Sequence, residues 1–122
     1  MDFDMSQLNT RDTEYLIKCF FDMIQEQKTI SKKIYETKNN LLEEKQKETE
    51  HEAKLWLETD FKEKQCTNKE LREAYVKQQM KDYISKRGKL QNEVKKLERE
   101  YEISTHIIVI LIALLDQVII DE

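Results

Sequence analysis

Residues 76–118 read VKQQMKDYISKRGKLQNEVKKLEREYEISTHIIVILIALLDQV and carry the clearest periodicity of the chain. Mostly apolar side chains recur along it at alternating steps of four and three residues, and we call these positions the seam. A repeat of 3.5 residues keeps one stripe of a helix against a partner helix only if the two supercoil. The stretch therefore predicts a long coiled-coil helix. Its seam residues are Val76, Met80, Tyr83, Arg87, Leu90, Val94, Leu97, Tyr101, Ser104, Ile108, Leu111, Leu115 and Val118.

A weaker seam with the same spacing lies in the first part of the chain. It ends where residues 43–52, EEKQKETEHE, contain no apolar side chain. We expect no buried seam to pass through this segment in phase, with local Glu–Lys pairs supporting the helix instead. The sequence leaves open whether the helix is continuous there. The residues of the first seam are Leu16, Phe20, Met23, Gln27, Ile30, Ile34, Thr37 and Leu41.

The connection between the two helices is predicted at residues 59–67. A capping box, Thr67 with Glu70, indicates the start of the second helix. Two long helices joined by so short a loop fold back antiparallel. The prediction is an all-α fold: one helical-hairpin domain over residues 1–122, with helices at about 11–58 and about 68–119. Because the chain has no Pro and one Gly, it lacks the turn residues of sheet folds.

Matching the two seams predicts a register for the antiparallel pair. Arg87 falls opposite Leu41. It either holds the register there or, as we favour, extends its guanidinium to solvent beside Gly88. The facing pairs are then Leu16 with Leu111, Phe20 with Ile108, Ile30 with Leu97, and Ile34 with Val94.

The chain offers few groups for chemistry. Cys19 and Cys66 show no metal-ligand spacing, and His51 and His106 have no ligand set close in sequence. We therefore expect neither an enzyme nor a bound metal or cofactor. The first ten residues lack the basic start and apolar core of a signal peptide, so we expect a cytoplasmic protein.

Apolar residues near both chain ends exceed what one partner helix can cover. The longest run, residues 107–115, is nine residues. A membrane span needs roughly 20, so membrane association is the least favoured interpretation. Self-association into a dimer or tetramer covers the excess better. Ile17 and Val109 also lie off the seam. The predicted oligomerisation residues are Phe20, Phe21, Ile24, Ile107, Ile108, Ile110, Leu111, Ile112 and Leu115.

The loop end is the basic part of the chain. Residues 59–99 hold 12 basic and 7 acidic side chains, whereas the segments on either side are net acidic. Basic groups beside aromatic rings suit single-stranded nucleic acid, but a solvated end with mutually packed aromatic residues has the same composition. We place Tyr83 on the seam. The candidate contact residues are Trp56, Phe61, Lys62, Lys64, Lys69, Arg72 and Lys77.

Residues 59–62 read TDFK, and residues 67–76 read TNKELREAYV. This pair of segments resembles the junction in small helical proteins of tailed phages and prophages of Gram-positive bacteria. In them a T-D-F-K segment precedes T-N-x-x-x-R-x-A-Y-V and a second long helix. The resemblance covers about 24 residues and implies an accessory of phage replication or recombination, without assigned catalytic residues. The matching residues are Thr59, Asp60, Phe61, Lys62, Thr67, Asn68, Arg72, Ala74, Tyr75 and Val76.

The expected function is therefore non-enzymatic. The preferred hypothesis is a phage-type coiled-coil protein that binds and modulates a host or phage protein as an adaptor or inhibitor, including inhibition of a host defence enzyme. The alternative is a recombination or replication accessory that binds single-stranded DNA through the basic loop end.

Overall fold

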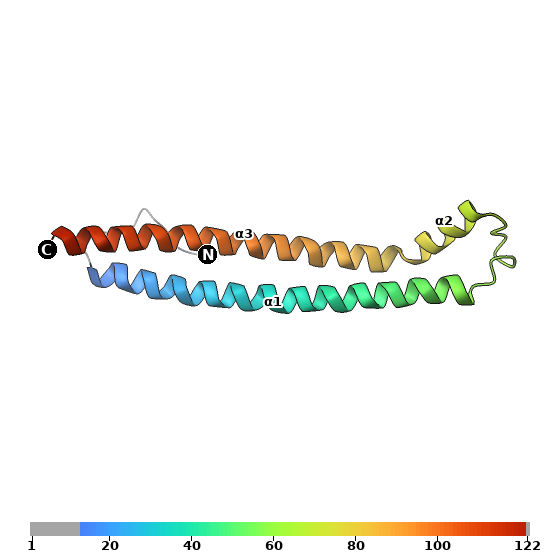
Figure 1. Ribbon diagram of the computed structural model, residues 1–122, viewed down its shortest axis with the longest axis horizontal. Helices are drawn as coiled ribbons and strands as arrows, with labels where there is room; N and C mark the ends of the chain where they lie inside the picture. Colours follow the sequence, from blue (N-terminus) through green and yellow to red (C-terminus); the bar gives the residue numbers. More distant parts are fainter. Residues whose placement is uncertain (1–12, 122) are drawn as a thin grey trace. The chain divides into compact units, whose positions relative to one another are not determined.

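The computed structural model describes residues 13–121, in which three helices account for almost the whole chain. They are α1 (Thr13–Glu58), α2 (Lys69–Gln79) and α3 (Lys81–Asp121). α1 and α3 run side by side in opposite directions, which confirms the predicted all-α hairpin (Figure 1). Two compact units divide the chain. We call Met1–Ile34 with Lys96–Glu122 the terminal unit, and Tyr35–Lys95 the loop unit.

The terminal unit is built on an apolar core between α1 and α3. Leu16 and Leu111 are fully buried, and Ile30 and Leu97 are nearly so. These four residues occupy seam positions, as the 3.5-residue repeat predicts. The core cluster consists of Leu16, Cys19, Met23, Leu111 and Val118, with Tyr15, Phe20, Ile107, Ile108, Leu114 and Leu115 packed against it.

A polar layer within the terminal unit reveals the register. The Gln27 side-chain amide donates to the Ser104 hydroxyl at 3.1 Å and to the Thr105 hydroxyl at 2.8 Å. Ser104 has no exposed surface, and its hydroxyl donates to the Tyr101 carbonyl at 2.6 Å. The predicted register, which places Gln27 level with Glu100, is wrong by about one helical turn. Apolar seam residues still pack against one another after a shift of one turn. A buried hydroxyl such as that of Ser104 needs a specific hydrogen-bond partner and so fixes the register.

The seam of α1 continues through the segment that lacks apolar residues. α1 is unbroken there, and Leu41, Glu44, Glu48, His51 and Leu55 keep the alternating steps of three and four. Glu44 is buried and the others are half-buried. The expectation that no seam passes through residues 43–52 in phase is therefore wrong. Polar side chains occupy the seam positions instead of apolar ones.

The second predicted helix differs from the expected single element. α2 ends at Gln79 and α3 begins at Lys81, with Met80 between them at φ −89° and ψ −3°. The Met80 N–H donates to the Val76 carbonyl at 3.0 Å, and the Ile84 N–H donates to the Met80 carbonyl at 3.1 Å. Val76 and Met80 are both 3% exposed, so burial continues across the break.

The loop contains a single helical turn with its own caps. The Asp60 carboxylate accepts from the Glu63 N–H at 3.2 Å and begins the turn. The Cys66 N–H donates to the Phe61 carbonyl at 2.8 Å, and the Gln65 N–H donates to the Lys62 carbonyl at 3.1 Å. This pair of bonds is a Schellman motif, with Gln65 in the left-handed region at φ 59°.

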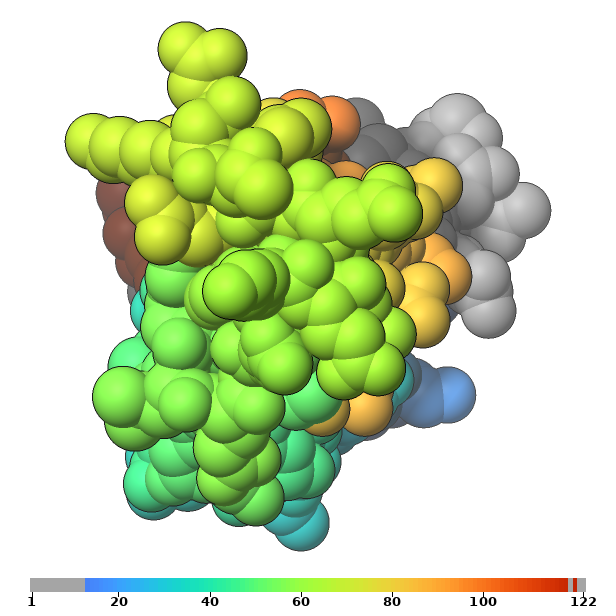
Figure 2. Space-filling view, turned by 90° about the vertical axis from the view of Figure 1, so that its right-hand side faces the viewer, coloured from blue at the N-terminus to red at the C-terminus, as the bar shows by residue number. Residues whose placement is uncertain are grey.

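Helix α2 begins one residue later than the capping box predicts. Asn68 is its N-cap, with an extended backbone and a side-chain oxygen that accepts from the Leu71 N–H at 2.8 Å. Asn is at least as favourable an N-cap as Thr, so either residue satisfies the local pattern. The predicted cap at Thr67 is wrong by one position. Figure 2 looks onto this end, where the loop and α2 lie in front.

We expect Gln65→Gly to stabilise the protein by up to about 1 kcal/mol. A left-handed backbone costs an L-residue roughly 1–2 kcal/mol, and the larger loss of chain entropy for Gly offsets part of that gain. Urea unfolding followed by circular dichroism measures the difference. The matched control is Gln65→Ala, which keeps the Cβ atom. An equal gain from Gln65→Ala would show that the positive φ is not the cause.

Candidate interaction surfaces

An exposed apolar face lies on one side of the terminal unit. It is formed by residues that directly follow seam positions: Ile17 and Phe21 on α1, and Val109 and Ile112 on α3. These side chains are 41%, 62%, 59% and 44% exposed, respectively. Ile24, which follows seam residue Met23, is half-buried at the edge. We call these five residues the apolar face.

The two helices contribute to the same side because of their antiparallel packing. Such helices are related by a two-fold axis perpendicular to both, so the residue after a seam position points to the same side on each. The Gln27 and Ser104 contact puts Phe21 level with Ile110, one residue from Val109. The apolar face is therefore one contiguous patch across α1 and α3.

The opposite side of the terminal unit is less uniform. On α3 it exposes Ile103 and Ile110, at 44% and 41%. On α1 the residues that precede seam positions include Asp22 and Glu26, which are exposed. Among residues 13–118, the exposed large apolar side chains on this side therefore lie on α3.

The structure separates the predicted oligomerisation residues into two groups. Leu111 is fully buried within the chain, and Phe20, Ile107, Ile108 and Leu115 pack against the core cluster. These five side chains stabilise the hairpin itself. Surface for a partner is offered by Phe21, Ile110 and Ile112, and in part by Ile24. Ile17 and Val109, which the predicted set omits, are as exposed as these residues.

The apolar face is large enough to affect association. Complete burial of one such side chain contributes about 1.5–3 kcal/mol, and these are roughly half exposed. Covering the face therefore contributes roughly 3–6 kcal/mol per copy. Two copies together reach the range of the entropic cost of association, about 4–15 kcal/mol. A stable complex therefore also needs polar contacts around the rim of the apolar face.

Helix α3 also meets the length and composition required of a membrane span. Among the described helices, Lys81–Val118 contains an apolar window of 18 residues, of which 11% lie buried within the chain. The sequence argument counted only the uninterrupted apolar run, residues 107–115, and so missed this longer apolar window. Length and composition do not separate membrane insertion from association with another chain, because both would cover the same side chains.

A charged cluster occupies the seam of the loop unit. Glu44 Oε1 lies 3.1 Å from Lys86 Nζ and 3.5 Å from Lys47 Nζ. The hydrogen bond from Lys86, reinforced by the positive charges of Lys86 and Lys47, holds the pKa of the Glu44 carboxyl below its ordinary value. Glu44 is thus a charged group at a position that a coiled coil normally fills with an apolar residue.

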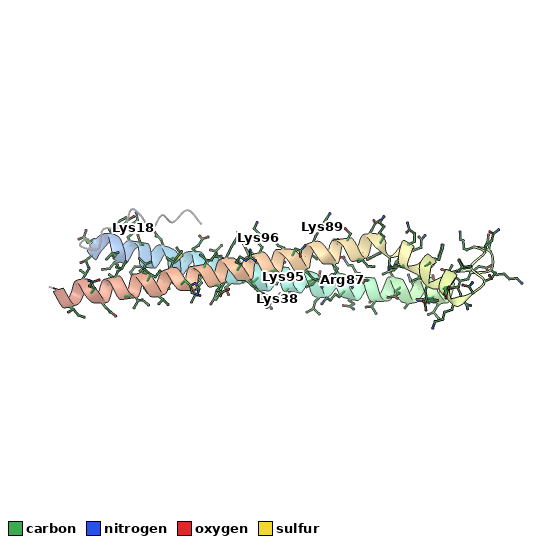
Figure 3. The ribbon with its side chains drawn as sticks, turned by 90° about the horizontal axis from the view of Figure 1, so that it is seen from above. Lys18, Lys38, Arg87, Lys89, Lys95 and Lys96 are labelled. Carbon is green, nitrogen blue, oxygen red and sulfur yellow. The ribbon has the colours of Figure 1, made fainter. Side chains whose placement is uncertain are left out.

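A second ion pair joins Arg87 on α3 to Glu48 on α1. Arg87 Nη1 donates to Glu48 Oε1 at 2.6 Å, and the two side chains are 33% and 12% exposed. Placing Arg87 opposite Leu41, with its guanidinium directed to solvent, was wrong because a seam carboxylate is available to it. Figure 3 shows Lys89, two residues further along α3, on the exposed surface instead.

An aromatic stack completes this polar part of the seam. The His51 and Tyr83 rings lie 4.7 Å apart at 24°. Both side chains are half-buried at seam positions. The stack agrees with the predicted place of Tyr83 on the seam.

The aromatic residues of the loop end pack against one another. Phe61 lies between Trp56, at a ring separation of 5.5 Å, and Tyr75, at 6.1 Å. Trp56 remains 40% exposed and borders a groove of about 190 Å³ with Val76 and Met80. These contacts agree with the interpretation of mutually packed aromatic residues rather than free stacking platforms.

The basic candidates surround this cluster. Lys62, Lys64, Lys69 and Lys77 are exposed, and Arg72 is half-buried. Lys69 Nζ lies 3.8 Å from the carboxylate of Glu73 on the next turn. The carboxylate of Glu73 therefore reduces the positive charge that Lys69 presents.

The described residues contain no group of three or more His, Cys, Asp and Glu side chains arranged to hold a metal ion. The thiols of Cys19, which is buried, and Cys66, which is half-buried, are both free.

Comparison with known proteins does not assign the chain to a family. No family model matches it, and neither a curated protein nor a solved structure does.

We expect Arg87→Met to destabilise the protein by about 1–3 kcal/mol. The substitution removes the partner of a carboxylate whose other oxygen, Glu48 Oε2, is already buried without a hydrogen-bond partner among the described residues. The double variant Glu48→Leu/Arg87→Met should recover most of this loss, since it removes both charges. Urea unfolding of the double-mutant cycle measures the coupling. If the losses of stability in the two single variants simply added up in the double variant, the Glu48–Arg87 ion pair would make no contribution to stability.

Proposed function

We propose that this protein is a non-enzymatic coiled-coil interaction protein that assembles with a second copy of itself and binds a protein partner as an adaptor or inhibitor. The observation that carries the proposal is the apolar face, four of whose side chains are 41% to 62% exposed. A soluble chain needs such a surface covered to avoid nonspecific aggregation. A second copy supplies a face of matching chemistry.

The loop unit is the proposed site for the protein partner. Its groove combines apolar walls at Trp56, Val76 and Met80 with exposed carboxylates at Glu52 and Glu73. Trp is enriched in protein–protein contacts, and polar side chains form the rim of such contacts. None of these residues belongs to the apolar face, so one chain has surface for both interactions. The resemblance of the loop to phage accessory proteins is compatible with this role.

Phe21→Glu tests the self-association. Phe21 is 62% exposed, so the substitution leaves the hairpin core intact and puts a carboxylate into the proposed contact. We expect the dissociation constant of the assembly to rise at least about tenfold. Analytical ultracentrifugation over a range of concentrations measures it, with circular dichroism as the check on folding.

The matched control is Leu57→Glu, because Leu57 is an apolar residue of the loop unit that is 85% exposed. It should assemble like the unmodified protein. A monomeric unmodified chain at micromolar concentration would contradict the proposal. Flotation of that monomer with liposomes would instead assign the apolar surface to a membrane.

Nucleic-acid binding through the basic loop end is the second candidate, supported by the exposed Lys62, Lys64, Lys69 and Lys77. The proposed protein-binding role predicts no retardation of an oligothymidylate in a mobility-shift assay at 50 mM salt. Retardation that falls steeply by 200 mM salt, and is lost in Lys62→Glu/Lys64→Glu, would favour this candidate instead, because phosphate contacts release counterions.

A further inference from the structure

The outward-facing row of α1 is symmetric about Phe21. It reads Glu14, Ile17, Phe21, Ile24 and Lys28, at steps of three and four residues. Glu14 and Lys28 each lie seven residues from Phe21, which is about two helical turns. Both are exposed, and neither forms an ion pair with another described residue. The row is thus acidic at one end, apolar in the middle and basic at the other end.

We propose that the apolar face binds the same face of a second copy in antiparallel orientation, with the two α1 helices crossing at Phe21. This inference rests on the self-association proposed above and adds its geometry. A two-fold axis perpendicular to α1 beside Phe21 places Glu14 of each copy against Lys28 of the other. Opposite charges then meet twice at the rim of one apolar contact, which sets orientation as well as affinity.

The parallel arrangement of the same two faces is less favourable. A two-fold axis along the helices would place α1 over α3 of the second copy, with equivalent levels of the hairpin side by side. Glu14 would then lie over Asp116, which follows seam residue Leu115 and is exposed beyond Ile112. Like charges would meet at the rim, so the charge pattern favours the antiparallel form.

The apolar content of the face also suits a second copy. Its four well-exposed side chains present on the order of 400 Å² of apolar surface, which is the size of the largest apolar patch on a typical monomer, a patch that is often functional. A stable dimer needs about 800 Å² on each partner, so the polar rim must be part of the contact. The antiparallel form supplies that rim with opposite charges.

Thiol cross-linking tests the orientation. In a Cys66→Ser background, in which the remaining Cys19 is only 7% exposed, three single variants are made: Glu14→Cys, Lys28→Cys and Asp116→Cys. The Glu14→Cys chain carries a size tag, and pairs of variants are mixed and treated with bismaleimidoethane. We expect the Glu14→Cys and Lys28→Cys mixture to give a heterodimer several times stronger than either homodimer. The background chain alone should give no cross-linked dimer.

Two outcomes would overturn the orientation. Dominant cross-linking of Glu14→Cys to Asp116→Cys would indicate parallel stacking, and dominant homodimers of Glu14→Cys would place the two α1 helices parallel. Sedimentation of the same mixtures separates the two proposals. A dimer with the wrong cross-links contradicts only the geometry, whereas a monomer contradicts the self-association on which it rests.

Discussion

The structure depends on one constraint: a seam of 3.5-residue periodicity that α1 and α3 share while running in opposite directions. In the terminal unit this seam is mostly apolar and forms a core around Leu16, Met23 and Leu111. In the loop unit its α1 side is filled by Glu44, Glu48 and His51, which find partners on α3. The periodicity is therefore retained where the chemistry changes.

The polar positions of the seam determine which alignment of the two helices is allowed. Apolar side chains can slide past one another by a turn at modest cost, because burial is not directional. A buried hydroxyl or carboxylate loses its hydrogen bond on the same shift. Ser104 with Gln27, and Glu48 with Arg87, are such contacts. They explain why a register predicted from apolar stripes alone missed the observed one.

The apolar face consists of side chains that the packing of α1 against α3 leaves exposed. Residues at seam positions stabilise the hairpin. Leu111 is one of them, and although it is large and apolar it has no exposed surface for a partner to contact. Residues one step past the seam on both helices reach the same side and remain exposed, among them Phe21 and Val109. Apolar content alone therefore does not identify an interaction surface, because the antiparallel pairing decides which side chains stay available.

Local patterns in the sequence were enough to predict two long helical segments, their approximate ends and the antiparallel hairpin. These follow from local information: the repeat of apolar residues, the absence of Pro, and turn-forming residues in one short segment. The folded chain was needed to establish the register, the polar contacts of residues 43–52, the break at Met80 and the composition of the apolar face. The register, the cross-helix polar contacts and the composition of the apolar face depend on residues far away in the chain that lie opposite in space. Periodicity within one helix carries no information about such a neighbour.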